Sequence, residues 1–422
     1  MSGDSVVQLT DSRRRAIVFA LLTGTCLSSL EVMAVGPAMP RVVQDLGRAG
    51  LYPWVFTAFI AAQTLTIPMY GWLSDRIGRR DSYLVGVCLF LLGSVACALA
   101  ETMLAMVLGR AVQGLGAGAL ITLTMTLFGD LYAVDQRTRM QGYFSLVWGV
   151  SSLLGPLLGG WLTDQLSWRW IFGVNVVPGL VAAGITWRFV PADLGRSGAN
   201  ERTMSAMVLF RDPSQRAATG SGLLLGASLF GIVGYLPLWI QAVRGGSAMD
   251  AGLALVPMSL SWTLAANLAG RLLGRFGYLH LVRFGLLCVA VGTLWAALDP
   301  VSSPGLVVFG LGMGFTISLF TVAVQESAPP TLRGMATSAP VFARSVGGAL
   351  AMPLLAGLAG LQAGVTEFSA VEGLDAGIVR VFVGIAITGC SAALVGSWYF
   401  PDDLSKWRES GNGIRNTKID GK

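Results

Sequence analysis

Histidine and charge are scarce in this 422-residue chain, which has one histidine, His280, and only 12% charged residues. A soluble domain carries about twice that share of charge. The five cysteines stand apart from one another and from His280, with no Cys-x-x-Cys pair. A zinc site, a disulfide framework and a Ser/His/Asp hydrolase therefore lack the residues that they need. Because no Gly-x-x-x-x-Gly-Lys-Ser/Thr loop is present for binding ATP either, we expect no enzymatic activity, no metal and no cofactor.

Apolar residues and glycine are abundant instead. Hydrophobic residues make up 54% of the chain, and glycine occupies 55 positions, about twice its usual share. In a bilayer, small residues allow helix backbones to approach closely, because lipid supplies no hydrophobic drive between helices. This composition predicts a membrane protein built from closely packed helices.

Twelve apolar stretches approach the length of a membrane-spanning helix, which needs about 20 mostly apolar residues. Ten are of full length and contain no charged residue, one contains only Glu31, and one is free of charge but short. The predicted spans are 16–40, 49–74, 82–100, 111–129, 140–163, 170–187, 217–243, 251–270, 284–298, 300–325, 345–366 and 381–401. We therefore expect an all-α membrane protein with twelve transmembrane helices, embedded in a lipid bilayer.

Basic residues gather in alternate loops. If both termini are cytoplasmic, 22 of the 29 Lys and Arg residues fall on the cytoplasmic side. Because positive charge collects on that side of membrane proteins, the bias predicts both termini inside a multi-pass protein of the inner (cytoplasmic) membrane. Topology and anionic lipid headgroups account for the net charge of +6, so we expect no nucleic-acid partner.

The chain divides into similar halves around one long polar segment, 191–216. The pattern Gly-x-Leu-x-x-Arg-x-Gly that begins at Gly71 recurs 199 residues later, and Gly-Leu-Gly-x-Gly at 114–118 recurs 196 residues later. Two matches at nearly one offset predict two pseudo-symmetric six-helix bundles facing a central cavity. The predicted domains are a bundle at 1–190, a cytoplasmic linker at 191–216, a bundle at 217–401 and a cytoplasmic tail at 402–422.

A short predicted cytoplasmic turn follows the second span. It holds Gly71, Asp75, Arg76, Gly78, Arg79 and Arg80. This pattern resembles the loop motif of the major facilitator superfamily. The resemblance implies that Asp75 caps a neighbouring helix and pairs with arginine in the outward-facing state, so that the six residues act as a conformational gate. A plain basic loop would account for the arginines but not for Asp75 or the glycines.

Arg110 directly precedes the charge-free stretch 111–129, and it lies about two turns into the fourth span when that span is taken to start at Met103. An ionised side chain there is costly and usually functional. The string Leu-Gly-Arg110-Ala-Val-Gln-Gly resembles the superfamily motif whose arginine is linked to proton transfer. The alternative is that Arg110 snorkels to the outer interface.

Glu31 is the only acidic residue well inside a predicted span. Keeping a carboxylate ionised there is expensive, so it tends to take up a proton. We expect Glu31 and Arg110 to serve proton coupling. The alternative places Glu31 near the outer mouth, where it only faces water.

Small residues form a close-contact face in the fifth span, where a proline bends the helix. The residues are Gly149, Gly155, Pro156, Gly159 and Gly160. The string resembles the motif that marks antiporters within the superfamily. A generic kinked helix would need a proline and one glycine at most.

Three further strings resemble the drug:proton antiporter family, whose usual members have fourteen helices. They are the segments 168–179 and 235–241, and Arg333-Gly with Arg344-Ser-Val-Gly-Gly. No additional helix pair fits between the halves, because 191–216 is polar and short. The chain is therefore expected to be a twelve-helix relative of that family.

Several aromatic and polar residues are candidates for the wall of a substrate cavity, although such residues serve packing more often than pockets. They are Gln63, Gln113, Tyr143, Trp148, Tyr235, Trp239, Trp262, Phe315, Phe342 and Arg344. An aromatic, weakly polar cavity would suit lipophilic cations or neutral drugs.

Together these features predict a monomeric, proton-coupled antiporter that exports small amphiphilic or lipophilic compounds by alternating access, with the proton gradient as its energy source. One alternative is a transporter of lipids or lipid-linked molecules on the same fold. The other is a transport-dead membrane sensor.

Overall fold

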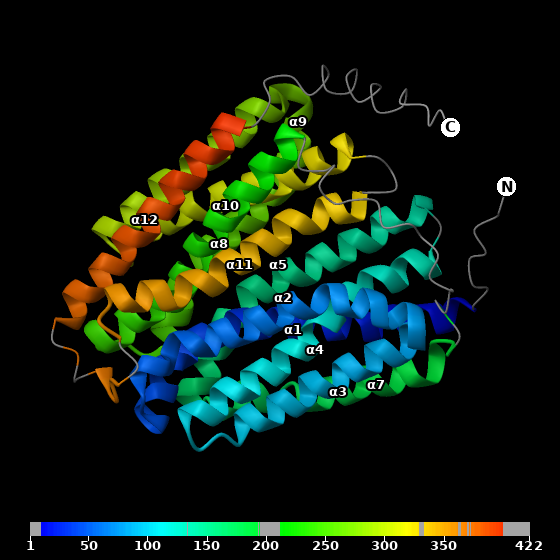
Figure 1. The fold of residues 1–422 in the computed structure, drawn as a ribbon, viewed down its shortest axis with the longest axis horizontal. Helices are drawn as coiled ribbons and strands as arrows, with labels where there is room; N and C mark the ends of the chain where they lie inside the picture. The colour runs from blue at the N-terminus through cyan, green and yellow to red at the C-terminus, as the bar shows by residue number, and fades with distance from the viewer. Residues whose placement is uncertain are drawn as a thin grey trace, which may run out of the picture. The chain divides into compact units, whose positions relative to one another are not determined.

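The computed structural model describes residues 10–132, 134–192, 194, 212–328, 333–361, 364–368, 371 and 373–399. In these residues the fold is helical throughout, with no strand (Figure 1). The long helices are α1 (Asp11–Leu46), α2 (Tyr52–Ile77), α3 (Arg79–Ala98), α4 (Met103–Leu131), α5 (Val134–Gln165), α8 (Pro213–Leu238), α9 (Ala248–Leu298), α10 (Ser303–Ser327), α11 (Arg333–Leu358) and α12 (Leu374–Tyr399). Shorter helical segments are η1 (Ala49–Leu51), α6 (Arg169–Gly173), α7 (Val176–Phe189) and η3 (Trp239–Val243).

Eleven helical segments of the described chain are long and apolar enough to cross a membrane. One of them, α9, has 51 residues, more than twice the ~20 that a span requires. The helix is interrupted at Gly277, whose φ of 73° and ψ of 166° are not helical. Since α9 therefore contributes two spans, the described residues contain the twelve spans that the sequence predicts.

The helices extend beyond the charge-free stretches that predict them. The first span is predicted at 16–40, whereas α1 continues to Leu46. The largest difference concerns 345–366, where the helix begins instead at Arg333 and ends at Leu358. The predicted span begins directly after Arg344, whereas the helix includes Arg344. Beyond Leu358 the chain turns at Gly360, whose φ of 78° lies in the left-handed region that ends many helices.

The first sequence repeat marks the same structural position in each half. Gly78 separates α2 from α3 with a φ of 98°, and Gly277 separates the two limbs of α9 with a φ of 73°. Glycine adopts this conformation without the steric cost that other residues meet. The repeat therefore reflects a turn that both halves require.

The second repeat places glycines at corresponding helix contacts. A side chain on Gly116 would collide with the backbone of Phe90, and a side chain on Gly312 would collide with the backbone of Val289. The two obstructing residues are themselves 199 positions apart. The repeats are thus structural, because the same close backbone contacts recur in each half.

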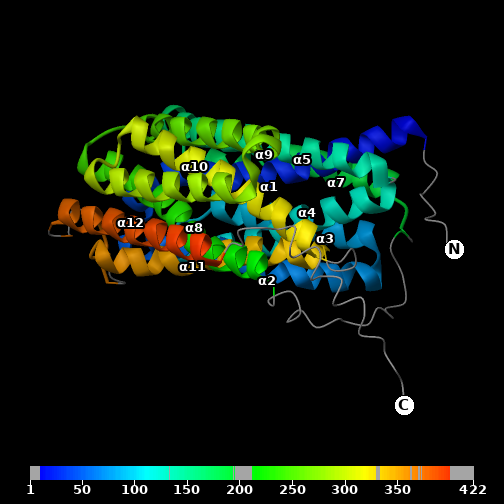
Figure 2. The ribbon, with the colours of Figure 1, turned by 90° about the horizontal axis from the view of Figure 1, so that it is seen from above.

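The described residues form two compact units. The first comprises those within Met1–Glu201, Gly231–Val256 and Met352–Val381, and the second those within Arg202–Phe230, Pro257–Ala351 and Phe382–Lys422. In the first unit, α3 packs against α4 and α7, and α1 packs against the same two helices (Figure 1, Figure 2). The predicted domain boundaries stay predictions, and the tail at 402–422 and most of the linker at 191–216 lie outside the described residues.

Candidate functional site

Glu31 of α1 and Arg110 of α4 form an ion pair inside the first unit. Arg110 Nη1 lies 2.8 Å from Glu31 Oε1. Only 2% of Glu31 and 1% of Arg110 is exposed. The structure therefore brings together the two residues that the sequence predicts for proton coupling, although their role in coupling stays a prediction.

The structure differs from the two alternative placements, which put Glu31 at an outer mouth and Arg110 at the outer interface. Glu31 does not face an outer mouth, because it is buried and α1 continues beyond it to Leu46. Arg110 does not snorkel to an interface, because its guanidinium turns toward Glu31.

The Arg110 guanidinium has several further partners. Nη1 also donates to Gln113 Oε1 at 2.7 Å, and Nε donates to the Val55 carbonyl oxygen at 3.4 Å. The Phe59 ring covers one face, with its centroid 4.0 Å from the guanidinium carbon. Carboxylate, amide, carbonyl and ring together offset the desolvation of a charge that would otherwise be very costly to bury.

The second oxygen of Glu31 accepts a hydrogen bond from Asn175. Asn175 Nδ2 lies 2.7 Å from Glu31 Oε2. Ser94 Oγ connects the two sides of the pair, since Gln113 donates to it at 2.9 Å and Asn175 at 3.5 Å. The five polar residues form a closed network from α1, α3, α4 and the α6–α7 junction, which we call the Glu31 network.

Local sequence explains how Asn175 and Ser94 reach this network. Asn175 precedes α7, and Pro178 in the first turn of α7 lacks the N–H that would continue a helix from α6. The break leaves the Asn175 side chain buried beside Glu31. Next to Ser94, Gly93 has no side chain, and a Cβ there would collide with the Gln113 backbone. The α3–α4 approach is therefore close enough for the Ser94–Gln113 bond.

Two members of the network were not predicted as site residues. Asn175 is part of a string that carries the family resemblance, and Ser94 was not singled out. An asparagine within an apolar span is a usable signal, because a polar group in hydrocarbon needs a partner. Serine is common in spans, so only the contacts distinguish Ser94.

The C-terminal half has no such network at the corresponding positions. The repeat offsets relate Arg110 to Leu306 and Gln113 to Phe309. Leu306 is 1% exposed and Phe309 is fully buried, so both are packing residues. Although the halves share their helix contacts, the charged network belongs to one of them.

The predicted gate residues lie at the α2–α3 junction. Asp75 pairs with Arg79 at 2.7 Å, and Arg79 also lies 3.3 Å from Asp130 of α4. Arg79 donates to Ser74 as well. The turn thus holds α2, α3 and α4 together, while capping of a neighbouring helix by Asp75 stays a prediction.

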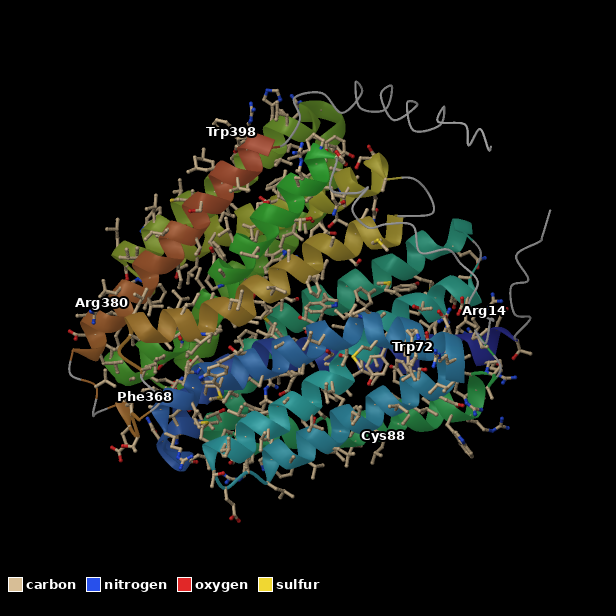
Figure 3. The ribbon with its side chains drawn as sticks, in the orientation of Figure 1. Arg14, Trp72, Cys88, Phe368, Arg380 and Trp398 are labelled. Carbon is tan, nitrogen blue, oxygen red and sulfur yellow. The ribbon has the colours of Figure 1, made fainter. Side chains whose placement is uncertain are left out.

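The other two arginines of this turn have separate partners. Arg80 pairs with Asp81 at 2.8 Å. Arg76 lies over the ring of Trp72, 3.9 Å from its centroid, and Trp72 is labelled in Figure 3. Gly71 has no heavy atom within 4 Å of the position where a Cβ would lie.

The glycines of the fifth span bring α5 into close contact with α1 and with the start of α9. A Cβ on Gly159 would collide with the Ala34 carbonyl group, and one on Gly160 would lie 2.6 Å from the Ala248 carbonyl oxygen. Gly155 meets Met33 of α1 in the same way. Pro156 lies inside α5, and its carbonyl oxygen faces Gly252 of α9. Gly149 is partly exposed.

Polar contacts reinforce this end of the first unit. Asp164, near the end of α5, accepts hydrogen bonds from the backbone N–H groups of Ala248 at 3.2 Å and Met249 at 2.7 Å. These are orphan donors at the start of α9, where a carboxylate is favourable. Gln241 donates to the Pro37 carbonyl oxygen at 2.7 Å. These hydrogen bonds join segments from both halves of the sequence. We call the contacts of Asp164 with Ala248 and Met249, together with that of Gln241 with Pro37, the α5–α9 closure.

The predicted cavity residues are dispersed. Gln113 belongs to the Glu31 network, and Gln63 donates to Ser28 at 3.5 Å. Tyr235 is fully buried and donates to the Met352 carbonyl oxygen at 2.6 Å. Phe315 is 4% exposed and forms a T-shaped ring pair with Phe284. The partly or largely exposed candidates are Tyr143, Trp148, Trp239, Trp262, Phe342 and Arg344. Their assignment to one substrate cavity stays a prediction.

A cavity of about 740 Å³ lies elsewhere in the first unit. Its lining comes from the end of α1, from η3 and from residues around the start of α12, including Gln44, Gln241, Phe368 and Asp375. None of the ten predicted cavity residues borders it.

The sequence model of the family described as the Major Facilitator Superfamily matches residues 21–352, which is well over half of the chain. The protein therefore belongs to this superfamily of membrane transporters, in agreement with its all-helical fold.

Two relatives carry names that refer to drugs. The Multidrug transporter protein MdtP of Bacillus subtilis (strain 168) is 28% identical over 415 residues, covering 84% of this chain and 76% of its own length. Multidrug resistance protein 3 of the same strain is 29% identical over 392 residues, covering 78% and 77%. Among solved structures, a bacterial homologue of the human lysosomal transporter Spinster, in an inward-facing and unoccupied conformation, has a TM-score of 0.75. It is 17% identical and covers 96% of this chain and 99% of its own, which shows the shared fold.

Proposed function

We propose that the protein is a proton-coupled antiporter that exports small amphiphilic or lipophilic compounds by alternating access. The observation that carries the proposal is the buried Glu31–Arg110 pair, in which Asn175 occupies the second carboxylate oxygen. The names of the B. subtilis relatives support drugs as the transported class. The glycine string of α5, with its likeness to the antiporter motif, supports export.

Proton uptake by Glu31 would change the energy of the network. The ionised carboxylate accepts from Arg110 and Asn175, whereas a protonated carboxyl leaves the guanidinium without a counter-charge. Removing one partner of a buried ion pair costs about 3–5 kcal/mol. Because Glu31 lies on α1 and Arg110 on α4, protonation favours a different arrangement of these helices. A proton thereby shifts the populations of the conformational states.

Alternating access requires closures that open. The α5–α9 closure joins parts of both sequence halves at Asp164 and Gln241, and these contacts would have to break when that end admits or releases substrate. Close packing of α5 on α1 through Gly159 connects the closure to the helix that carries Glu31.

Orientation in the membrane is part of the proposal. We place both termini in the cytoplasm and the protein, as a monomer, in the inner membrane, because basic residues favour that side. A green fluorescent protein fused after residue 422 is expected to fluoresce, and alkaline phosphatase fused at the same position is expected to be inactive. Active phosphatase with a dark fluorescent protein would reverse the topology.

Reconstitution in vesicles tests the transport proposal. Rhodamine 6G, N-phenyl-1-naphthylamine and 8-anilino-1-naphthalenesulfonate supply a cationic, a neutral and an anionic amphiphile. With pyranine trapped inside, movement of a transported dye is expected to drive protons in the opposite direction, and protein-free vesicles report leakage. Dye transport without proton movement would exclude antiport. No transport of any dye in vesicles of correctly folded protein would favour a sensor instead.

A further inference from the structure

Arg344 is a charged residue in the central part of a helix. Among the described helices, with the two limbs of α9 counted separately, three Asp, Glu, Lys or Arg residues lie at least seven residues from both helix ends, and Arg344 is one of them. The other two are Glu31 and Arg110, which neutralise each other. Arg344 lies eleven residues after the start of α11, or about 16 Å along the helix axis. Since the hydrocarbon core is about 30 Å thick, this position is close to the middle of the membrane.

Arg344 differs from Arg110 in having no counter-charge. Within the described residues, its guanidinium makes no ion pair and no hydrogen bond, whereas Arg110 has a carboxylate, an amide and a carbonyl as partners. The described carboxylates of the second unit are at helix ends or outside helices, at Asp212, Asp299 and Glu326. None of them lies at the depth of Arg344.

The helix face that carries Arg344 packs inside the protein from Arg344 onward. Residues four, seven and eleven positions later share this face, and these are Gly348, Ala351 and Leu355, all buried. Met335, Phe342 and Leu350 lie on other sides of α11, and 38%, 44% and 55% of each is exposed. Phe342 and Arg344 are therefore not on one face. Arg344 itself is partly exposed.

Packing fixes this orientation of α11. A Cβ on Gly226 of α8 would collide with the Arg344 carbonyl group, and one on Gly347 would collide with Leu223. Gly348 meets the ring of Phe230 in the same way. With the two backbones in close contact, α11 cannot rotate Arg344 toward lipid without separating from α8.

A lone cation at this depth is expensive, and such residues mark substrate or ion pathways. We propose that Arg344 is a binding subsite for an anionic group, such as a sulfonate, carboxylate or phosphate, on an amphiphilic substrate. This inference rests on the proposed function and narrows its substrate class. A guanidinium binds two oxygens of a carboxylate or phosphate through two parallel hydrogen bonds, and a sulfonate presents oxygens in a similar arrangement. An apolar tail attached to such an anion would suit the surrounding apolar helices.

The charge of Arg344 itself favours the same class of substrate. A substrate anion neutralises this guanidinium, whereas a substrate cation is repelled by it. An anionic lipid headgroup offers the same chemistry, but headgroups lie at the interface and not near the midplane.

Binding of three ligands with one tail tests the proposal. Decanesulfonate, decanol and decyltrimethylammonium are titrated below their micellar concentrations into wild-type protein in phosphatidylcholine nanodiscs, with the intrinsic tryptophan fluorescence as the signal. We expect decanesulfonate to bind at least tenfold more tightly than decanol, and decyltrimethylammonium to bind more weakly than decanol. Because this measurement uses no proton gradient, it does not depend on whether Glu31 couples transport.

Variants assign the preference to Arg344. Arg344→Gln is expected to raise the Kd of decanesulfonate at least tenfold and to leave that of decanol within twofold, whereas Arg344→Lys should keep most of the preference. Arg380→Gln is the matched control, because Arg380 is an exposed arginine near the start of α12 (Figure 3). It should bind like the wild type.

In phosphatidylcholine nanodiscs, any one of three results would overturn the inference. They are equal weakening of all three ligands by Arg344→Gln, an equal loss of preference in Arg380→Gln, and tighter binding of decyltrimethylammonium than decanesulfonate by the wild type. Nanodiscs containing phosphatidylglycerol distinguish the source of the anion. Unchanged decanesulfonate affinity there supports a substrate subsite, whereas competition by the lipid assigns Arg344 to headgroup binding and rejects the substrate role.

If Arg344→Gln does not fold, the Arg344→Lys titration decides, since loss of the preference in a folded Lys variant also counts against the proposal.

Discussion

Replacing Glu31 by glutamine is expected to abolish export driven by a proton gradient, while the protein still folds and still binds neutral compounds. Glutamine has nearly the same shape, and its side-chain oxygen can accept a hydrogen bond from Arg110 or Asn175. It takes up no proton, so the network no longer alternates between two charge states. The measurement is efflux from proteoliposomes with an imposed pH difference, together with binding at two pH values.

Two further variants define the role of this carboxyl group. Glu31→Asp should retain part of the activity, because it keeps the titrating group but shortens its reach. Glu326→Gln is the matched control, since Glu326 is exposed near the end of α10, and it should export at the wild-type rate. If Glu31→Gln exports normally and binding keeps its pH dependence, the proton site lies elsewhere, and Asp75 is the next acid to test.

Replacing Gly159 by leucine is expected to cause a large loss of folded protein. The Gly159 position faces the Ala34 carbonyl group of α1, and backbone cannot move aside as a flexible side chain can. Overpacking typically costs about 1–3 kcal/mol, and a side chain forced against backbone belongs at the upper end of this range. The yield of monodisperse protein in gel filtration and the Tm report the effect. Gly159→Ala should show a smaller loss.

The same helix provides a control for this prediction. Gly142 has no heavy atom within 4 Å of the position where its Cβ would lie. Gly142→Leu should therefore change the Tm little, although it introduces the same residue into α5. Equal Tm values for the two leucine variants would show that the α1–α5 contact does not limit stability.

The number and placement of the helices were largely predictable because the bilayer acts as a solvent. In hydrocarbon every backbone polar group must be paired within the chain, so long apolar stretches become helices. The predicted bounds 345–366 are wrong because they treat the charged residue Arg344 as the limit of a span. An arginine is tolerated inside α11, so its position gives no information about where the helix begins.

The candidate site was predictable in part. Glu31 and Arg110 were identified by type, because ionisable residues within apolar stretches are costly. Their pairing, and the contribution of Asn175 through the α6–α7 break, required the structure. Tyr235 shows that residue type alone does not identify a cavity residue. A polar aromatic residue in a span is a cavity candidate, but the structure shows Tyr235 fully buried, with its hydroxyl donating to the Met352 carbonyl oxygen.

By itself, the sequence determined that the chain is helical, that it has twelve stretches suited to crossing a membrane and that its halves repeat, because hydropathy and glycine spacing are properties of the linear chain. Only the tertiary structure decided which polar residues meet. Contact between helices depends on the depth of each residue and on the face of the helix it occupies, and both are set by packing with other helices. That is why Arg110 has a carboxylate beside it and Arg344 has none among the described residues, although the sequence presents both as arginines in apolar helices.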